Sequence, residues 1–358
     1  MLTSARDDLE AALDAIERHE PAINGMITVT AEQAQEAAAA ADRAAADGHW
    51  LGLLHGMTFA IKDNIQTAGV RTTSGSLHFK DVVPNQDAFV VQRLKAAGAV
   101  IVGKATMQEL AFGIRSDNPV SGQCRNPWDR TRVPGGSSGG SGAVVAAGMA
   151  QGALGTDTGG SVRLPAAMNG VAGLRPTHGR VPNHGSTPVS VAYDTIGPMA
   201  RRVDDVARIL AVTAREEPGS APTSAPDLGN FLPGLHDGIA GLRLGIPRNH
   251  YFLDCDDDIA EAVMTAVRAL EAQGAKIVEV DVEGAENSHQ WATIQIYSDA
   301  CAYHADRLDK HPELFSPPVL ERMLVGRSFT SVDYANACRA REAWQRTLAA
   351  LYQDIDIL

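Results

Sequence analysis

The sequence predicts an α/β fold in which helices cover a mostly parallel sheet. Two segments of similar sequence, residues 94–102 and 270–278, each combine the end of a helix, a glycine and a strand rich in β-branched residues. A further strand is expected over residues 242–246, so helices and strands alternate along the chain. The chain has 358 residues, 44% of them hydrophobic and 21% charged, which is typical of a globular protein and excludes disordered, collagen-like and coiled-coil chains.

The spacing of apolar residues predicts the other elements. We expect a helix over residues 4–19, an alanine-rich helix over 30–48, a buried strand over 57–61, a helix over 143–149 and a long helix over 331–352. Ser4 with Asp7, and Thr30 with Gln33, have the spacing of a capping box, in which side chains satisfy free N–H groups at the start of a helix. Arg341 interrupts the apolar stripe of the last helix, whose middle is therefore expected near the surface.

Charge and composition narrow the possible partners. The formal net charge is −12, so the chain has no general attraction for phosphate backbones or anionic lipid, and we expect neither nucleic acid nor membrane as a partner. The sequence contains no apolar run of about 18 residues. Its first residues lack a basic region followed by an apolar one, so we expect no signal peptide. Its four cysteines lie far apart and form no CxxC pair. This pattern indicates neither a zinc site nor a disulfide framework, and it favours the cytoplasm.

Two loops rich in glycine and serine, residues 135–142 and 155–161, flank the small-residue helix expected over 143–149. Such tracts are usually linkers, but a linker would not enclose an apolar helix. A phosphate-binding loop is the second interpretation. The nearest match to a Walker motif, residues 98–105, ends in alanine where the magnesium-binding hydroxyl is needed, and its middle has a strand pattern.

The third interpretation is nucleophilic catalysis by a serine. Thr158, Gly159, Gly160 and Ser161 could place several backbone N–H groups close together, as an oxyanion hole requires. A serine nucleophile needs a base, and a desolvated, neutral lysine can replace histidine. Lys62, at the end of the buried strand expected over 57–61, is the best candidate, although a single lysine in such a place is more often a solvated surface charge.

Several long motifs together resemble the amidase signature family. They occupy residues 56–64, 134–141 and 155–165, with further landmarks in the usual order at 103–109, 126–129, 173–177 and 194–201. The resemblance covers nearly the whole chain. It implies one large α/β/α domain over residues 1–358 with a mixed, mostly parallel central sheet, core motifs at 53–202 and a surface excursion at 214–240.

The resemblance also implies a Ser–Ser–Lys triad. Ser161 is then the acyl-accepting nucleophile, Ser137 the bridging serine, which follows a cis peptide bond in this family, and Lys62 the general base. The backbone of Thr158, Gly159 and Gly160 would hold the oxyanion. Neither a metal nor an organic cofactor is implied.

Neighbouring residues of these motifs are expected to play supporting roles. Ser138 and Ser141 would make hydrogen bonds within the loops, since Ser138 is one residue out of step with the family's bridging serine. Asp157 would orient the nucleophile loop, and Arg163 would pair with a nearby carboxylate.

Three functions are compatible with these motifs. The preferred one is a free amidase that hydrolyses a small carboxylic amide or ureide, because Ala192-Tyr193-Asp194 stands where the glutaminase (A) subunit of the aspartyl/glutamyl-tRNA amidotransferase usually has Ser-Leu-Asp. That subunit, which works with a protein partner, is the alternative. A non-catalytic scaffold is the third, against which Lys62, Ser137 and Ser161 argue. Homodimers are common in the family, and no feature of the sequence establishes one here.

The last residues, Asp354-Ile355-Asp356-Ile357-Leu358, form an apolar, strand-like run without a polar cap. Members of the family usually continue well beyond this point. We therefore expect the sequence to be incomplete at its C-terminus, which would leave a sheet edge or an apolar face uncovered and remove part of the substrate pocket.

Overall fold

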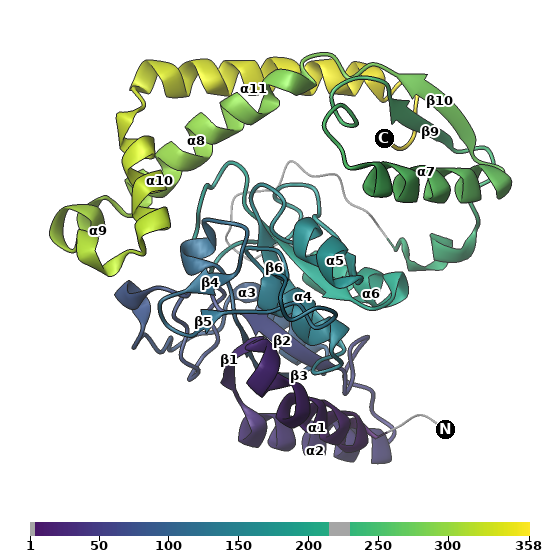
Figure 1. Ribbon diagram of the computed structural model, residues 1–358. Coiled ribbons are helices and arrows are strands. Elements are labelled where there is room, and N and C mark those ends of the chain that lie inside the picture. The colour runs from purple at the N-terminus through teal and green to yellow at the C-terminus, as the bar shows by residue number, and fades with distance from the viewer. Residues whose placement is uncertain (1–3, 215–229) are drawn as a thin grey trace. The chain divides into compact units, whose positions relative to one another are not determined.

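The computed structural model describes residues 4–214 and 230–358 (Figure 1). The chain divides into two compact units. The first contains the chain up to Leu232 together with Asp299–Val325, and the second contains Pro233–Ser298 and Gly326–Leu358. Most of the surface excursion expected at 214–240, namely residues 215–229, lies outside the described residues.

A six-stranded sheet with the order β1-β3-β2-β6-β8-β7 forms the centre of the first unit (Figure 1). Its strands are β1 (Met26–Val29), β2 (Thr58–Lys62), β3 (Val100–Ala105), β6 (Gly152–Asp157), β7 (Ala172–Gly173) and β8 (Thr195–Ala200). The central strands β3, β2 and β6 are parallel, whereas β1 is antiparallel to β3, and β8 is antiparallel to both β6 and β7. Only β1 and β8 therefore run against the other strands described in this sheet, which confirms the mixed, mostly parallel arrangement.

Both faces of this sheet are covered, because apolar side chains alternate along its strands. In β2, Ala60 belongs to the core on one face, while Phe59 and Ile61 belong to the core on the other. The first face packs against α1 (Ala5–Ile23), α2 (Ala31–Ala46) and α4 (Gly139–Ala146). The second packs against α3 (Phe89–Ala96) and α6 (Val203–Thr213). These layers confirm the predicted α/β/α architecture.

The first residues of α1 and α2 show whether the two predicted capping boxes form. Ser4 and Asp7 form the predicted capping box at the start of α1. The prediction for Thr30 is wrong, because its hydroxyl donates to the carbonyl oxygen of Ile101 at 3.0 Å instead of capping α2. The acceptor lies in the neighbouring strand β3, which only the tertiary fold brings close to Thr30.

The second unit contains the parallel pair β9 (Arg243–Pro247) and β10 (Lys276–Val280), with α7 (Asp257–Ala272) between them along the chain. Both strands and the long helix α11 (Ser331–Leu351) agree with the sequence-based predictions. The middle of α11 is largely exposed, as Arg341 indicated. The other described elements are η1 (Leu77–Phe79), η2 (Glu109–Ala111), β4 (Asp117–Asn118), β5 (Gly122–Gln123), α5 (Arg163–Asn169), η3 (Leu232–His236), η4 (Ala285–Asn287), α8 (Ser288–Tyr303), α9 (Ala305–Lys310), η5 (Pro312–Leu314) and α10 (Pro317–Ser328).

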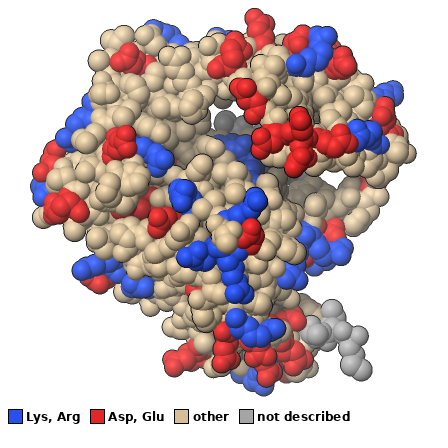
Figure 2. Space-filling view, viewed as in Figure 1, with Lys and Arg blue, Asp and Glu red and all other residues tan. Residues whose placement is uncertain are grey.

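Acidic residues gather on the surface of α1 and α2 (Figure 2). Asp7, Glu10, Asp14 and Glu17 are exposed on α1. Within residues 4–214 and 230–358, no helix combines the length and the apolar character that crossing a bilayer requires.

Gly103 lies where strands β1 and β3 approach closely. Its φ is +155°, and a Cβ at this position would lie 2.2 Å from the carbonyl oxygen of Thr28 in β1. We expect Gly103→Ala to lower the free energy of unfolding by about 2–4 kcal/mol, through backbone strain and overpacking. Gly48→Ala is the control, because Gly48 also has a positive φ, +77°, but its Cβ would meet no atom within 4 Å. Urea denaturation measures both variants. An equal decrease in the free energy of unfolding of the two would contradict the role of close packing at Gly103.

Candidate active site

Lys62 is the last residue of β2, and its side chain is completely buried. Its Nζ lies 2.8 Å from Ser137 Oγ, 2.7 Å from Thr156 Oγ1 and 3.3 Å from the Thr156 carbonyl oxygen. Because β2 and β6 are parallel neighbours, their carboxyl ends meet at one edge of the sheet, and this places Lys62 beside Thr156. The surface-charge interpretation of Lys62 is therefore wrong.

Burial lowers the pKa of Lys62 from 10.5 to about 7, because apolar surroundings disfavour the charged ammonium group. The carboxylates of Asp157 and Asp194 oppose this shift. A substantial fraction of the amine is therefore neutral near pH 7, which is the state that a general base needs.

The contacts of Lys62 also indicate where its lone pair points. A neutral amine has two N–H donors and one lone pair, and the Thr156 carbonyl can only accept. The Thr156 hydroxyl accepts a hydrogen bond from Asn64 Nδ2 at 3.2 Å and has a second lone pair for Lys62. When the two N–H groups of Lys62 occupy the two Thr156 oxygens, its lone pair faces Ser137 Oγ, ready to accept the Ser137 proton.

We expect Thr156→Val to lower kcat up to about 100-fold, because the amine of Lys62 loses the hydroxyl that orients it. Thr156→Ser, which keeps the hydroxyl, should restore most of the activity. Thr58→Val is the matched control, since Thr58 is equally buried on the same sheet and its hydroxyl accepts from Gln151 N. The measurement is kcat against pH, and equal activity in the Val and Ser variants at position 156 would contradict the assignment.

Ser137 lies in the loop before α4 and follows a cis peptide bond with Gly136, as the family resemblance implied. Its carbonyl oxygen accepts from Gln108 N at 3.0 Å. The predicted roles of its neighbours are confirmed: Ser138 Oγ donates to the Thr156 carbonyl and accepts from Thr156 N, and Ser141 Oγ donates to the Leu154 carbonyl. These bonds attach the first Gly/Ser loop to β6.

Ser161 lies beyond the end of β6, where its side chain is partly exposed. Its carbonyl oxygen accepts from Ser138 N at 3.3 Å, so the two serine loops meet through their backbones. Asp157 orients the nucleophile loop as predicted, because its carboxylate accepts from Gly160 N at 2.7 Å and from Val162 N at 3.1 Å, on both sides of Ser161. Arg163 forms two 3.0 Å bonds to the same carboxylate, which confirms its expected ion pair.

The segment of the predicted oxyanion hole is open on one side. A Cβ added at Gly159 or Gly160 would meet no atom within 4 Å, and Gly159 is exposed. The Gly160 N–H, however, already donates to Asp157. It is therefore not free to bind an oxyanion in this structure, which leaves the N–H groups of Thr158, Gly159 and Ser161 as the candidates.

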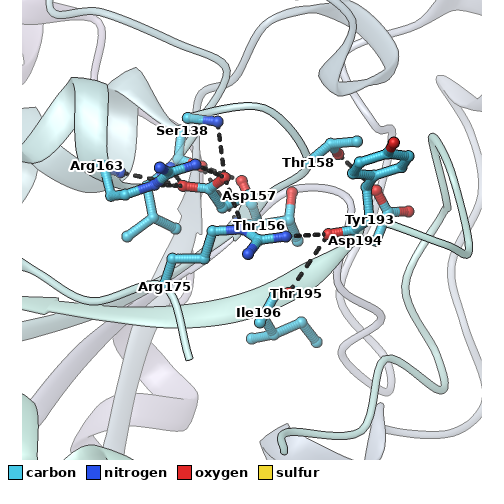
Figure 3. A network of polar contacts seen from close by, with 12 residues as sticks. Ser138, Thr156, Asp157, Thr158, Arg163, Arg175, Tyr193, Asp194, Thr195 and Ile196 are labelled. Carbon is cyan, nitrogen blue, oxygen red and sulfur yellow. Dashed lines mark hydrogen bonds and ion pairs between the residues drawn. The ribbon is translucent and has the colours of Figure 1, made fainter. Parts of the chain in front are cut away.

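Sequence reasoning missed two residues that Figure 3 places around this loop. Asp194, directly before β8, accepts from Thr158 Oγ1 at 2.5 Å. Arg175 pairs with Asp157 at 3.3 Å and donates to the Tyr193 carbonyl at 2.6 Å. Both residues lie in motifs that carry the family resemblance, 173–177 and 194–201, but these motifs do not indicate which groups the two side chains contact.

A second buried lysine, Lys104 in β3, lies near the strand that carries Lys62. Its Nζ donates to the Ile65 carbonyl at 2.6 Å and to Thr72 Oγ1 at 2.7 Å, and it lies 3.7 Å from the buried carboxylate of Asp63. These contacts tie down the turn that follows Lys62. The lysine of the near-Walker motif is therefore a structural residue in a strand, as the sequence pattern indicated.

Comparison with known proteins identifies the family. The family model described as Amidase matches residues 7–358, so the chain belongs to the amidase family. The glutamyl-tRNA(Gln) amidotransferase A subunit of Anaeromyxobacter sp. (strain K) is 43% identical over 279 residues, which are 78% of this chain and 57% of that protein. Its counterpart in Chromohalobacter salexigens is 35% identical, and the alignment covers 99% of this chain and 78% of that protein.

Solved structures share the fold over nearly the whole of this chain. One, described as an unexpected vestigial protein complex that reveals the evolutionary origins of an s-triazine catabolic enzyme, has a TM-score of 0.93 at 36% identity and covers 99% of this chain and 77% of that one. The native peptide amidase from Stenotrophomonas maltophilia has a TM-score of 0.82 at 29% identity, and the match covers 94% of this chain and 75% of that one. The chain thus spans between about half and four fifths of the length of the relatives described here.

Proposed function

We propose that this protein hydrolyses a carboxylic amide or ureide through an acyl-enzyme on Ser161, with Ser137 and Lys62 as a proton relay. The observation that carries the proposal is the 2.8 Å contact between a fully buried Lys62 Nζ and Ser137 Oγ, beside the loop that presents Ser161. A buried lysine with a pKa of about 7 costs stability, and a functional role explains why such a group is present.

In the first half of the proposed reaction, Lys62 takes the Ser137 proton and Ser137 takes the Ser161 proton. The Ser161 oxygen then attacks the amide carbonyl carbon, and backbone N–H groups of the loop receive the negative charge on the carbonyl oxygen. The C–N bond breaks as the relay returns the proton to the departing nitrogen, which leaves as ammonia or an amine. In the second half, water attacks the ester by the same relay, and this step releases the acid and restores Ser161.

A panel of amides tests this proposal and narrows the substrate class. Simple aliphatic amides, aryl amides, ureides and glutamine would be incubated with the protein, and release of ammonia or amine would be measured. We expect turnover of at least one class and covalent labelling of Ser161 by a fluorophosphonate. A pure, folded sample that hydrolyses none of them and is not labelled would overturn the proposal in favour of a non-catalytic scaffold.

The second candidate function is that of a glutaminase subunit. It is favoured by the 43% identity to the A subunit of a glutamyl-tRNA(Gln) amidotransferase. Against it stands Ala192-Tyr193-Asp194, in place of the Ser-Leu-Asp sequence expected in such a protein. Glutamine hydrolysis that depends on a copurifying protein would support this second function, whereas hydrolysis of other amides by the isolated chain would support the free amidase.

A further inference from the structure

Asp194 occupies a buried position between the nucleophile loop and the turn formed by residues 189–194. It is 7% exposed, and it directly precedes β8, whose Thr195 pairs with Asp157 at the end of β6. One carboxylate oxygen accepts from Thr158 Oγ1 at 2.5 Å. The other accepts from Val189 N at 2.8 Å and from Ser190 N at 3.1 Å.

A second connection runs parallel to the first. Arg175 lies between Asp157 and the carbonyl oxygen of Tyr193, so it joins the carboxylate that orients the nucleophile loop to the same turn (Figure 3). The turn is itself held from outside by Ser190 Oγ, which donates to Asp299 in α8 at 2.5 Å. Thr158 is therefore attached to a turn that is fixed at several points.

We propose that Asp194 is a positioning residue for the reaction: through Thr158 it holds the backbone N–H groups that precede Ser161 in the arrangement that receives the oxyanion. This inference rests on the proposed function. Its geometric basis is that the Thr158 side chain is hydrogen-bonded to Asp194, whereas a Cβ at the neighbouring Gly159 would meet no atom within 4 Å. Without the Asp194 bond, the segment between Asp157 and Ser161 loses its anchor on the β8 side.

Asp194 also acts on the base through its charge. The negative charges of Asp157 and Asp194 act on Lys62, and the positive charge of Lys62 acts on Asp194. Arg175 lies near both carboxylates, and Asp299 is bonded to Ser190 in the turn. Burial raises the pKa of Asp194, and its hydrogen bonds and Lys62 oppose that shift. When ionised, Asp194 raises the pKa of Lys62. Removing its charge should therefore move the acidic limb of the pH profile to lower pH, which a purely structural defect would not do.

Two variants separate the two effects. Asp194→Asn keeps the shape and an acceptor oxygen but removes the charge, so we expect kcat to fall about 10–100-fold, KM to change less, and the acidic limb of kcat/KM to move to lower pH. Thr158→Val removes only the hydroxyl, so we expect a similar loss of kcat with the limb unmoved. Thr158→Ser should recover activity. Asp205→Asn, on the outer helix α6, is the matched control and should behave as wild type.

The rate at which a fluorophosphonate labels Ser161 supplies a readout that does not depend on knowing the natural amide. Slower labelling of folded Asp194→Asn and Thr158→Val, relative to wild type and Asp205→Asn, would support the inference. Normal labelling and normal kcat in Thr158→Val would overturn it while leaving the proposed function intact, and Thr158→Val serves this purpose even if Asp194→Asn fails to fold. A wild-type protein that is neither labelled nor active would overturn the proposed function itself.

Discussion

Replacing Ser161 with alanine is expected to lower kcat for amide hydrolysis by at least about 10⁴-fold, because the oxygen that forms the acyl-enzyme is removed. The fold should not change, since the Ser161 contact that joins the two serine loops is made by its backbone carbonyl. Ammonia release gives the activity, and intact-protein mass spectrometry after treatment with a fluorophosphonate reports the adduct.

Ser121→Ala is the matched control for this experiment. Ser121 is half-buried like Ser161, but its hydroxyl bonds to Asn118 in a separate hairpin. We expect this variant to retain wild-type activity and to take up one phosphonyl group. An adduct on Ser161→Ala, or undiminished hydrolysis by a pure sample of it, would show that another group is the nucleophile.

Lys62→Met is expected to lose activity and gain stability at neutral pH. Without the base, kcat should fall about 10²–10⁴-fold. In the wild-type protein, kcat/KM should rise with pH through an apparent pKa near the value of about 7 that burial imposes on Lys62, because only the neutral amine accepts a proton. That acidic limb should be absent from the residual activity of the variant.

The gain in stability follows from linkage between folding and protonation. The unfolded chain binds a proton at Lys62 with a pKa of 10.5 and the folded chain with a pKa of about 7, so folded stability rises with pH between these values. At pH 7 the difference costs about 4 kcal/mol, which methionine would recover, less about 1–3 kcal/mol for the lost hydrogen bonds. Near pH 10 the gain should vanish. Urea denaturation at the two pH values measures it.

Lys104→Met is the informative comparison, because Lys104 is equally buried but faces the carboxylate of Asp63. Removing that lysine leaves a buried carboxylate without its cation, so this variant should be less stable than wild type at pH 7. A Lys62→Met protein that is destabilised as strongly as Lys104→Met would contradict the inference that burial destabilises the charged form of Lys62 more than its neighbouring carboxylates and hydrogen bonds stabilise it.

Most of the fold could be predicted from local sequence patterns. The strand ending at Lys62, the helix–glycine–strand steps, the capping box at Ser4 and the long helix α11 all follow from apolar spacing and short-range chemistry, and the structure confirms each. The capping box predicted at Thr30 does not form, because the Thr30 hydroxyl donates to the carbonyl oxygen of Ile101 in a strand that is distant in sequence. Local sequence patterns do not contain such a contact.

The sequence by itself therefore determined the candidate catalytic residues through its resemblance to the amidase signature family: Lys62 after a buried strand, and Ser137 and Ser161 in two Gly/Ser loops. Only the tertiary structure decided that Lys62 is fully desolvated, that Thr156, 94 residues away, orients its amine, and that Asp194 holds Thr158. The physical reason is that a pKa and a hydrogen-bond partner depend on which groups are adjacent in space. That adjacency arises when β2, β6 and β8 align in one sheet, and short-range sequence patterns do not contain it.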